Sequence, residues 1–213
     1  MTRRVALKAA VWVACLAPLA ALGFWIVTDD LTANPISFIT NHLGQWTLRL
    51  LLAALSTTPL RLLTGWGWPA RLRRLLGLFA FFYATMHFSV WIFLDHFLNW
   101  DQMASDIVER PYITLGLIAL TLLVPLAATS TAGMIKRLGA VAWRRLHRLV
   151  YVAAIAAVLH FVWLAKVGRT EPYYYAAVLA LLLGVRVVDA VRRLARRRRA
   201  RRQGTVAASS ATR

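Results

Sequence analysis

The sequence predicts an all-α integral membrane protein: a bundle of six transmembrane helices with both termini in the cytoplasm. The first observation is composition, because 60% of the 213 residues are hydrophobic and the mean hydropathy is +0.59, yet the formal charge is +18. A soluble domain of this length has too small a core for so many apolar residues. The second observation is a set of six apolar windows long enough to cross a bilayer. The third is the alternation of charge between those windows.

Each apolar window is expected to form one membrane-spanning helix. The first window follows Arg3, Arg4 and Lys8, but its apolar core is long for a signal peptide, so we interpret it as a retained helix. The second is the least certain because it contains Arg49. We expect residues 1–190 to form a single transmembrane domain and the basic segment 191–213 to be a disordered cytoplasmic tail. The six windows are 9–27, 43–60, 75–94, 111–128, 146–164 and 173–190.

The connections between the windows alternate strictly in charge. The N-terminus, the second connection (61–74), the fourth (136–145) and the tail are basic, whereas seven of the eight acidic residues lie in the other connections. The positive-inside rule therefore places both termini in the cytoplasm. We attribute the arginine run at 192–202 to topology and attraction to anionic membrane lipid, and we expect no nucleic-acid partner.

Two histidines are predicted to meet in the outer half of the membrane. At a helix rise of 1.5 Å per residue, His87 lies roughly 20 Å beyond Arg74 and His160 roughly 22 Å beyond Arg145. Ionisable side chains inside a membrane are costly and are therefore functional candidates. Two imidazoles that face each other from separate helices suit the axial positions of a six-coordinate haem. The chain has no Cys-x-x-Cys-His motif for covalent haem attachment.

The third candidate, His147, begins the segment "HRLVYVAAIAAVLH" and lies about 3 Å inside the cytoplasmic boundary. Thirteen residues separate it from His160, which places the two rings about 140° apart around a straight helix. Either the helix is bent, or His147 serves something other than the site of His160. His42 and His96 lie near outer helix ends, where we expect interfacial positions and not ligands.

Other sites compete with a haem for these histidines. Zinc is less suited, because no cysteine or carboxylate lies at matching depth. A proton-coupled small transporter or channel would use the histidines as relay groups, but it would also show intramembrane acids or helices broken near mid-membrane. A purely structural anchor needs no histidines at matched depth.

Three segments carry a resemblance to a known family: "RRLLGLFAFFYATMHF" (73–88), "LAATST" (126–131) and "RLGAVAWRRLHRLVY" (137–151). They resemble MsrQ, formerly called YedZ, over about residues 40–190. This is the haem-binding membrane subunit of the MsrPQ methionine sulfoxide reductase system, within the ferric-reductase-like transmembrane superfamily. The resemblance implies a six-span cytochrome b fold in the bacterial inner membrane.

The resemblance also implies cofactors and site residues. The membrane histidines of the family correspond to His87, His147 and His160. The superfamily pattern uses four histidines for two stacked haems, and this chain lacks the fourth. One haem b held by His87 and His160 is therefore expected, with His147 as the candidate ligand of a second. Members have been described with flavin mononucleotide (FMN), for which the sequence offers no recognisable pocket.

A function follows from the resemblance together with what the chain lacks. No dinucleotide-binding Gly-x-Gly-x-x-Gly follows a predicted strand, so electrons are expected from a separate donor, either membrane quinol or a cytosolic flavin reductase. The family passes them to a periplasmic molybdopterin enzyme, an MsrP-like catalytic subunit that repairs oxidised proteins. On this interpretation the chain is the electron-transfer subunit and not the sulfoxide-reducing catalyst. The acidic stretch "DHFLNWDQMASDIVE" (95–109) is the expected docking surface. Aromatic residues expected to pack on the porphyrin are Phe81, Phe82, Tyr83, Phe88, Trp91, Phe161 and Trp163.

Overall fold

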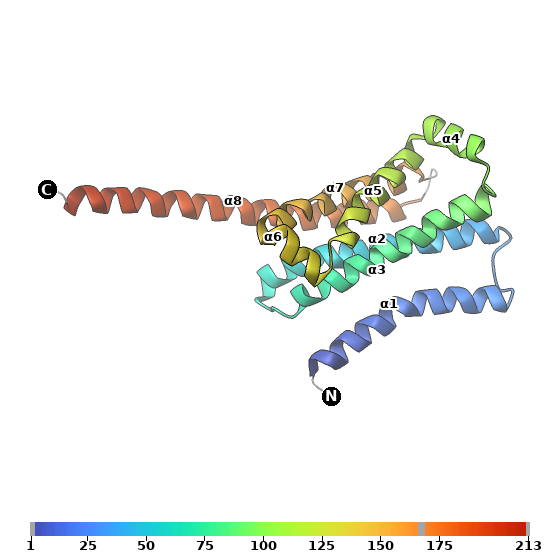
Figure 1. Ribbon diagram of the computed structural model, residues 1–213, viewed down its shortest axis with the longest axis horizontal. Helices are drawn as coiled ribbons and strands as arrows, with labels where there is room; N and C mark the ends of the chain where they lie inside the picture. The colour runs from blue at the N-terminus through green and yellow to red at the C-terminus, as the bar shows by residue number, and fades with distance from the viewer. Residues whose placement is uncertain (1–2, 166–168, 212–213) are drawn as a thin grey trace.

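The computed structural model describes the backbone of residues 3–165 and 169–211, and the side chains of residues 5–165 and 169–196. Within these ranges the regular structure is helical, as predicted. Figure 1 shows an elongated bundle whose last helix projects far beyond the others. The elements are α1 (Arg3–Val27), α2 (Pro35–Thr64), α3 (Pro69–Val90), the π-helical turn η1 (Trp91–Asp95), α4 (Trp100–Glu109), α5 (Pro111–Ala128), α6 (Ala132–Leu146), α7 (Leu149–Trp163) and α8 (Glu171–Ala211).

Several of these helices are long and apolar enough to cross a membrane. Among the described residues, α1, α3 with η1, α5 and α8 meet this requirement singly, and α6 with α7 meets it as a pair bent by 45°. α2 does not meet it, because its first half carries polar residues such as His42, Gln45 and Arg49. The chain therefore has the character of a membrane protein, while the count of six spans stays a prediction.

Local signals explain where the central helices begin and end. The Asn34 side chain accepts a hydrogen bond from the backbone N–H of Ser37 (3.0 Å) at the start of α2, and Pro35 occupies the first turn. Gly65 ends α2 in the left-handed conformation, with φ of 73°. α5 begins at Pro111 and coincides with the predicted window 111–128.

The bundle is built from two closely packed helix pairs. α2 packs along α3 and α5 along α7, while α8 covers α7 and α2. Fully buried alanines, Ala80 on α3 and Ala153 and Ala154 on α7, permit the close approach. α1 lies at the periphery, where the buried Tyr83 hydroxyl donates to the backbone carbonyl of Cys15 (2.7 Å). Cys15 is itself buried, in agreement with a packing role.

The predicted window 146–164 is not one straight helix. α6 ends at Leu146, the chain turns at His147 and Arg148, and α7 begins at Leu149. α6, which lies in the predicted basic connection, is itself interrupted at Gly139, where φ is 73°. This bend answers the spacing problem raised by the sequence, because His147 and His160 do not share one continuous helix.

α8 continues well beyond the predicted window 173–190. It is helical to Ala211, so most of the segment expected to be disordered is helix in the structure. Arginine and alanine have high helix propensity, and the segment extends a helix that is already nucleated, which removes the main obstacle to helix formation.

Candidate functional site

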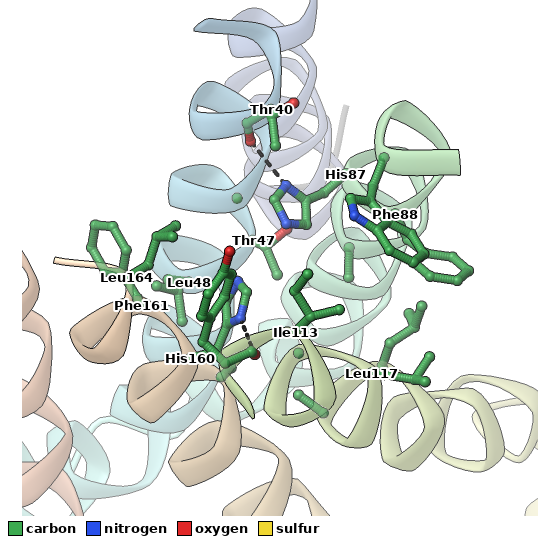
Figure 2. A pocket seen from close by; sticks show the side chains of 18 of the residues that line it. Thr40, Thr47, Leu48, His87, Phe88, Ile113, Leu117, His160, Phe161 and Leu164 are labelled. Atoms are coloured by element: carbon green, nitrogen blue, oxygen red, sulfur yellow. Dashed lines mark hydrogen bonds between the residues drawn. The ribbon is translucent and has the colours of Figure 1, made fainter. Parts of the chain in front are cut away.

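A cavity opens between α2, α3, α5 and α7, where the two helix pairs face each other (Figure 2). Its volume is about 270 Å³, compared with roughly 15 Å³ for a single water on the same measure. The lining is mainly apolar, with Leu48, Leu117 and Phe161 among the contributors. Such a space suits a large apolar group far better than a bare metal ion.

His87 from α3 and His160 from α7 line this cavity and face each other across it. Their ring centroids are 6.3 Å apart and their planes lie at 79°, close to perpendicular. The structure thus brings together the two histidines that were predicted to lie at the same depth. They come from different helix pairs, so the packing of the pairs sets their separation.

Each of these rings is anchored to a backbone carbonyl of a neighbouring helix. His87 Nδ1 lies 2.9 Å from the carbonyl oxygen of Thr40 on α2, and His160 Nδ1 lies 2.6 Å from that of Tyr112 on α5. A carbonyl can only accept, so Nδ1 must carry the proton in both rings. The Nε2 lone pairs are consequently free for a metal, which is the arrangement that orients histidine ligands in metal sites.

The spacing of the rings fits a single metal between two imidazoles. With a metal–nitrogen bond of about 2 Å on each side, and the radius of each ring added, two opposed axial ligands have centroids about 6 Å apart. Within the described parts of the chain, no three His, Cys, Asp or Glu side chains gather to hold an ion. Two opposed nitrogens in a large apolar cavity match the axial ligands of a planar iron cofactor.

His147 lies elsewhere. It occupies the turn between α6 and α7, and it is not among the residues that line the cavity. Its Nδ1 bonds to the carbonyl of Trp143 (3.1 Å), its ring stacks on the Trp143 ring (centroids 3.8 Å apart), and its Nε2 lies 3.5 Å from the Ser130 hydroxyl. The bend in the chain therefore directs His147 away from the site of His87 and His160.

The two histidines expected at the interface have structural partners. His42 Nε2 lies 3.1 Å from the carbonyl of Pro18, between α2 and α1. His96 is only 5% exposed, and its Nε2 donates to Asp106 of α4 (3.0 Å). His96 is therefore not an exposed side chain, because the turn after η1 folds the ring inward against α4, and its depth in the membrane stays a prediction.

The cavity also has charged lining residues, where η1 ends and α5 begins. Asp95 and Arg110 line it, and Arg110 also pairs with Asp106 (3.2 Å). A hydrogen bond to the Tyr112 hydroxyl, supported by the charge of Asp106, raises the pKa of Arg110. Since Asp106 is buried, the acidic stretch 95–109 is only partly the exposed surface that the sequence suggests.

The aromatic residues expected around the site divide into three groups. Phe88, Trp91 and Phe161 line the cavity. Tyr83 is buried against α1, and Phe81 packs at the edge of the hydrophobic core. Phe82 and Trp163 are exposed on the outside of the bundle.

Sequence reasoning did not identify Thr40 and Tyr112 as parts of the site. Both contribute through the backbone carbonyl, a group that every residue possesses. No side-chain pattern could have indicated them. Only the packing of α2 on α3 and of α5 on α7 shows which carbonyls lie beside the rings.

The chain is similar to known membrane proteins. The family described as "Ferric reductase like transmembrane component" matches residues 42–158, a range that includes His87 and ends just before His160. A protein of Rhodospirillum rubrum is 54% identical over 186 residues, covering 87% of this chain and 89% of its own length. Those of Herminiimonas arsenicoxydans (49% identity, 85% and 84% covered) and Xanthomonas campestris pv. campestris (51%, 86% and 86%) are similar. All three are named protein-methionine-sulfoxide reductase heme-binding subunit MsrQ.

Proposed function

Because the chain belongs to the MsrQ family of ferric-reductase-like membrane proteins, we propose that it binds one haem b between His87 and His160. We propose further that it carries electrons across the bacterial inner membrane to a separate periplasmic methionine sulfoxide reductase. The observation that supports this most directly is the pair of opposed imidazoles, 6.3 Å apart between centroids, in a large apolar cavity.

The protein's own residues would prepare the site in two ways. The carbonyls of Thr40 and Tyr112 hold each ring in the tautomer whose Nε2 can bind iron. Apolar side chains such as Leu48, Phe88 and Phe161 exclude water from the cavity. A bound haem supplies a single-electron carrier that alternates between the ferric and ferrous states. Solvent exclusion and axial ligation are the levers by which such a protein tunes the reduction potential.

The direction of electron flow rests on the predicted topology. With both termini in the cytoplasm, the outer end of the cavity near Asp95 and Arg110 faces the periplasm. The exposed residues of the outer connection 95–109 are the proposed contact for a molybdenum-dependent catalytic subunit. The donor is a membrane quinol or a cytosolic flavin reductase. His147, bonded to the Trp143 carbonyl and 3.5 Å from the Ser130 hydroxyl, does not line the cavity and is assigned an accessory role.

Absorbance spectra of the detergent-purified protein test the haem assignment. In the wild type we expect the spectrum of a low-spin b-type haem in both redox states, with about one haem per chain. His87→Ala and His160→Ala should each lose that haem or convert it to high spin, whereas His147→Ala, the matched control, should keep it. Protein without a Soret band from cells that supply haem would refute the proposal, as would loss in the His147 variant alone.

A reconstituted system tests the electron transfer. Reduced protein in vesicles should be reoxidised by a periplasmic MsrP-type enzyme when methionine sulfoxide is present, and not when either is omitted. A haem that stays reduced with both present would refute the proposed acceptor while leaving haem binding intact.

A further inference from the structure

Two glycines lie directly against the two histidine rings of the cavity. Gly44 on α2 faces His87, and Gly116 on α5 faces His160. We propose that Gly44 and Gly116 are positioning residues that fix the planes of the two axial imidazoles. This inference rests on the proposed haem ligation and concerns how the ligands are held.

The space at each glycine is tight: a larger residue would fit only if the neighbouring ring moved. A Cβ added at Gly44 would lie 3.1 Å from Cε1 and 3.2 Å from Nδ1 of His87. At Gly116 it would lie 3.0 Å from Nδ1 and 3.2 Å from Cε1 of His160. Favourable contacts between non-bonded carbons lie at about 3.5–4.0 Å. An alanine at either position would therefore press on the imidazole at the edge that carries its hydrogen bond.

The same local arrangement occurs twice. Thr40 lies four residues before Gly44, and Tyr112 lies four residues before Gly116. In an α-helix the N–H of residue i+4 bonds to the carbonyl of residue i, so each glycine lies directly above the carbonyl that receives the ring. Without a Cβ at that point, the imidazole N–H can reach a carbonyl that a helix normally shields. The missing side chain thus makes the histidine–carbonyl bond sterically accessible.

Helix stability does not account for these glycines, because glycine inside a helix is less favourable than alanine. Other helical glycines, namely Gly23, Gly77, Gly133 and Gly184, have nothing within 4 Å of an added Cβ. Among the glycines that the structure describes, the close fit is therefore specific to the two that face the histidines. Each ring is confined by a different helix, and the ring planes lie at 79° to each other.

Gly44→Ala and Gly116→Ala test the inference, with Gly77→Ala and Gly184→Ala as controls that make the same change in open space. Electron paramagnetic resonance of the oxidised protein is suited to this, because the spread of g-values in a low-spin bis-imidazole iron depends on the angle between the ring planes. We expect the two site variants to change the largest g-value and the midpoint potential. The two control variants should match the wild type.

A stability measurement covers the case in which a site variant loses its haem. Gly44→Ala should lower the unfolding midpoint of the otherwise unchanged chain. In a His87→Ala background, where the ring that the new methyl group meets is absent, the same substitution should lower the unfolding midpoint less, or raise it. Gly77→Ala should behave alike in both backgrounds.

The outcomes separate the inference from the function on which it rests. A wild type that binds no haem refutes the ligation itself and the positioning role with it. A wild type with bis-histidine haem, and alanine variants whose g-values and potential equal those of the controls, overturns the positioning role alone. An equal loss of stability from Gly44→Ala with and without His87 also overturns it.

Discussion

Replacing Asp106 with alanine is expected to destabilise the outer end of the bundle by about 2–4 kcal/mol. The Asp106 carboxylate joins two parts of the chain: one oxygen accepts from His96 Nε2 (3.0 Å) and the other pairs with Arg110 (3.2 Å). His96 and Asp106 are both buried, while the Arg110 side chain is 54% exposed. These contacts hold the turn after η1 against α4, above the mouth of the cavity.

The magnitude follows from the burial of each partner. A hydrogen bond to a charged group contributes about 1.5–3 kcal/mol, and removing the carboxylate leaves the buried His96 Nε2 without its partner, while Nδ1 keeps the Trp91 carbonyl (3.2 Å). The pair with Arg110 adds at most about 1 kcal/mol, because water screens an exposed charge. Asp106→Asn retains an oxygen that can accept from His96, so its cost should be roughly half that of alanine.

Unfolding in mixed micelles with increasing denaturing detergent measures the difference. Asp101→Ala is the matched control, because Asp101 is exposed in the first turn of the same helix and should cost no more than about 1 kcal/mol. If Asp106→Ala proves no more destabilising than Asp101→Ala, the His96–Asp106 contact does not hold the outer turn, and the reasoning from burial fails.

Two further predictions concern the packing of α8 on α2 and the membrane topology. Arg186→Met should destabilise the protein by about 1–3 kcal/mol, because Arg186 donates to the Leu55 carbonyl, which lacks its usual helical partner since residue 59 is proline. Pro59→Ala should recover part of this loss of stability, and the control Arg192→Met, at an exposed position, should cost little. Unchanged unfolding curves for Arg186→Met would contradict the assignment. In a Cys15→Ala background, a membrane-impermeant thiol reagent applied from the periplasm should label the Asp30→Cys variant and not the Gly67→Cys variant. The reverse labelling pattern would show the opposite orientation and would contradict the proposed direction of electron flow.

The sequence predicted those parts of the site that depend on helix periodicity and charge. Counting residues along two apolar windows placed His87 and His160 at the same depth in the membrane, and in the structure their rings face each other. The bounds of α5 were also predictable, because Pro111 marks a helix start and the apolar run ends at Ala128. Hydrophobic length and a regular rise are sufficient for such conclusions.

Other features depend on packing that one sequence does not encode locally. The bend at His147 and Arg148 arises between two helix-forming segments with no proline to mark it. The inward position of His96 depends on a π-helical turn followed by left-handed Phe97 and Leu98. The carbonyl partners of the ligand rings are backbone groups, which have no sequence signature at all.

The carbonyl anchors of His87 and His160 also bear on how the proposed carrier responds to protons. In many metal sites the outer nitrogen of a histidine ligand bonds to a carboxylate, whose protonation weakens the ligand as the pH falls. The carbonyls of Thr40 and Tyr112 have no proton to gain or lose over the physiological range. The ligand field should therefore stay constant with pH. The axial ligands should then contribute little to any pH dependence of the midpoint potential. On the proposed function, such a site would transfer electrons without taking up protons at its ligands.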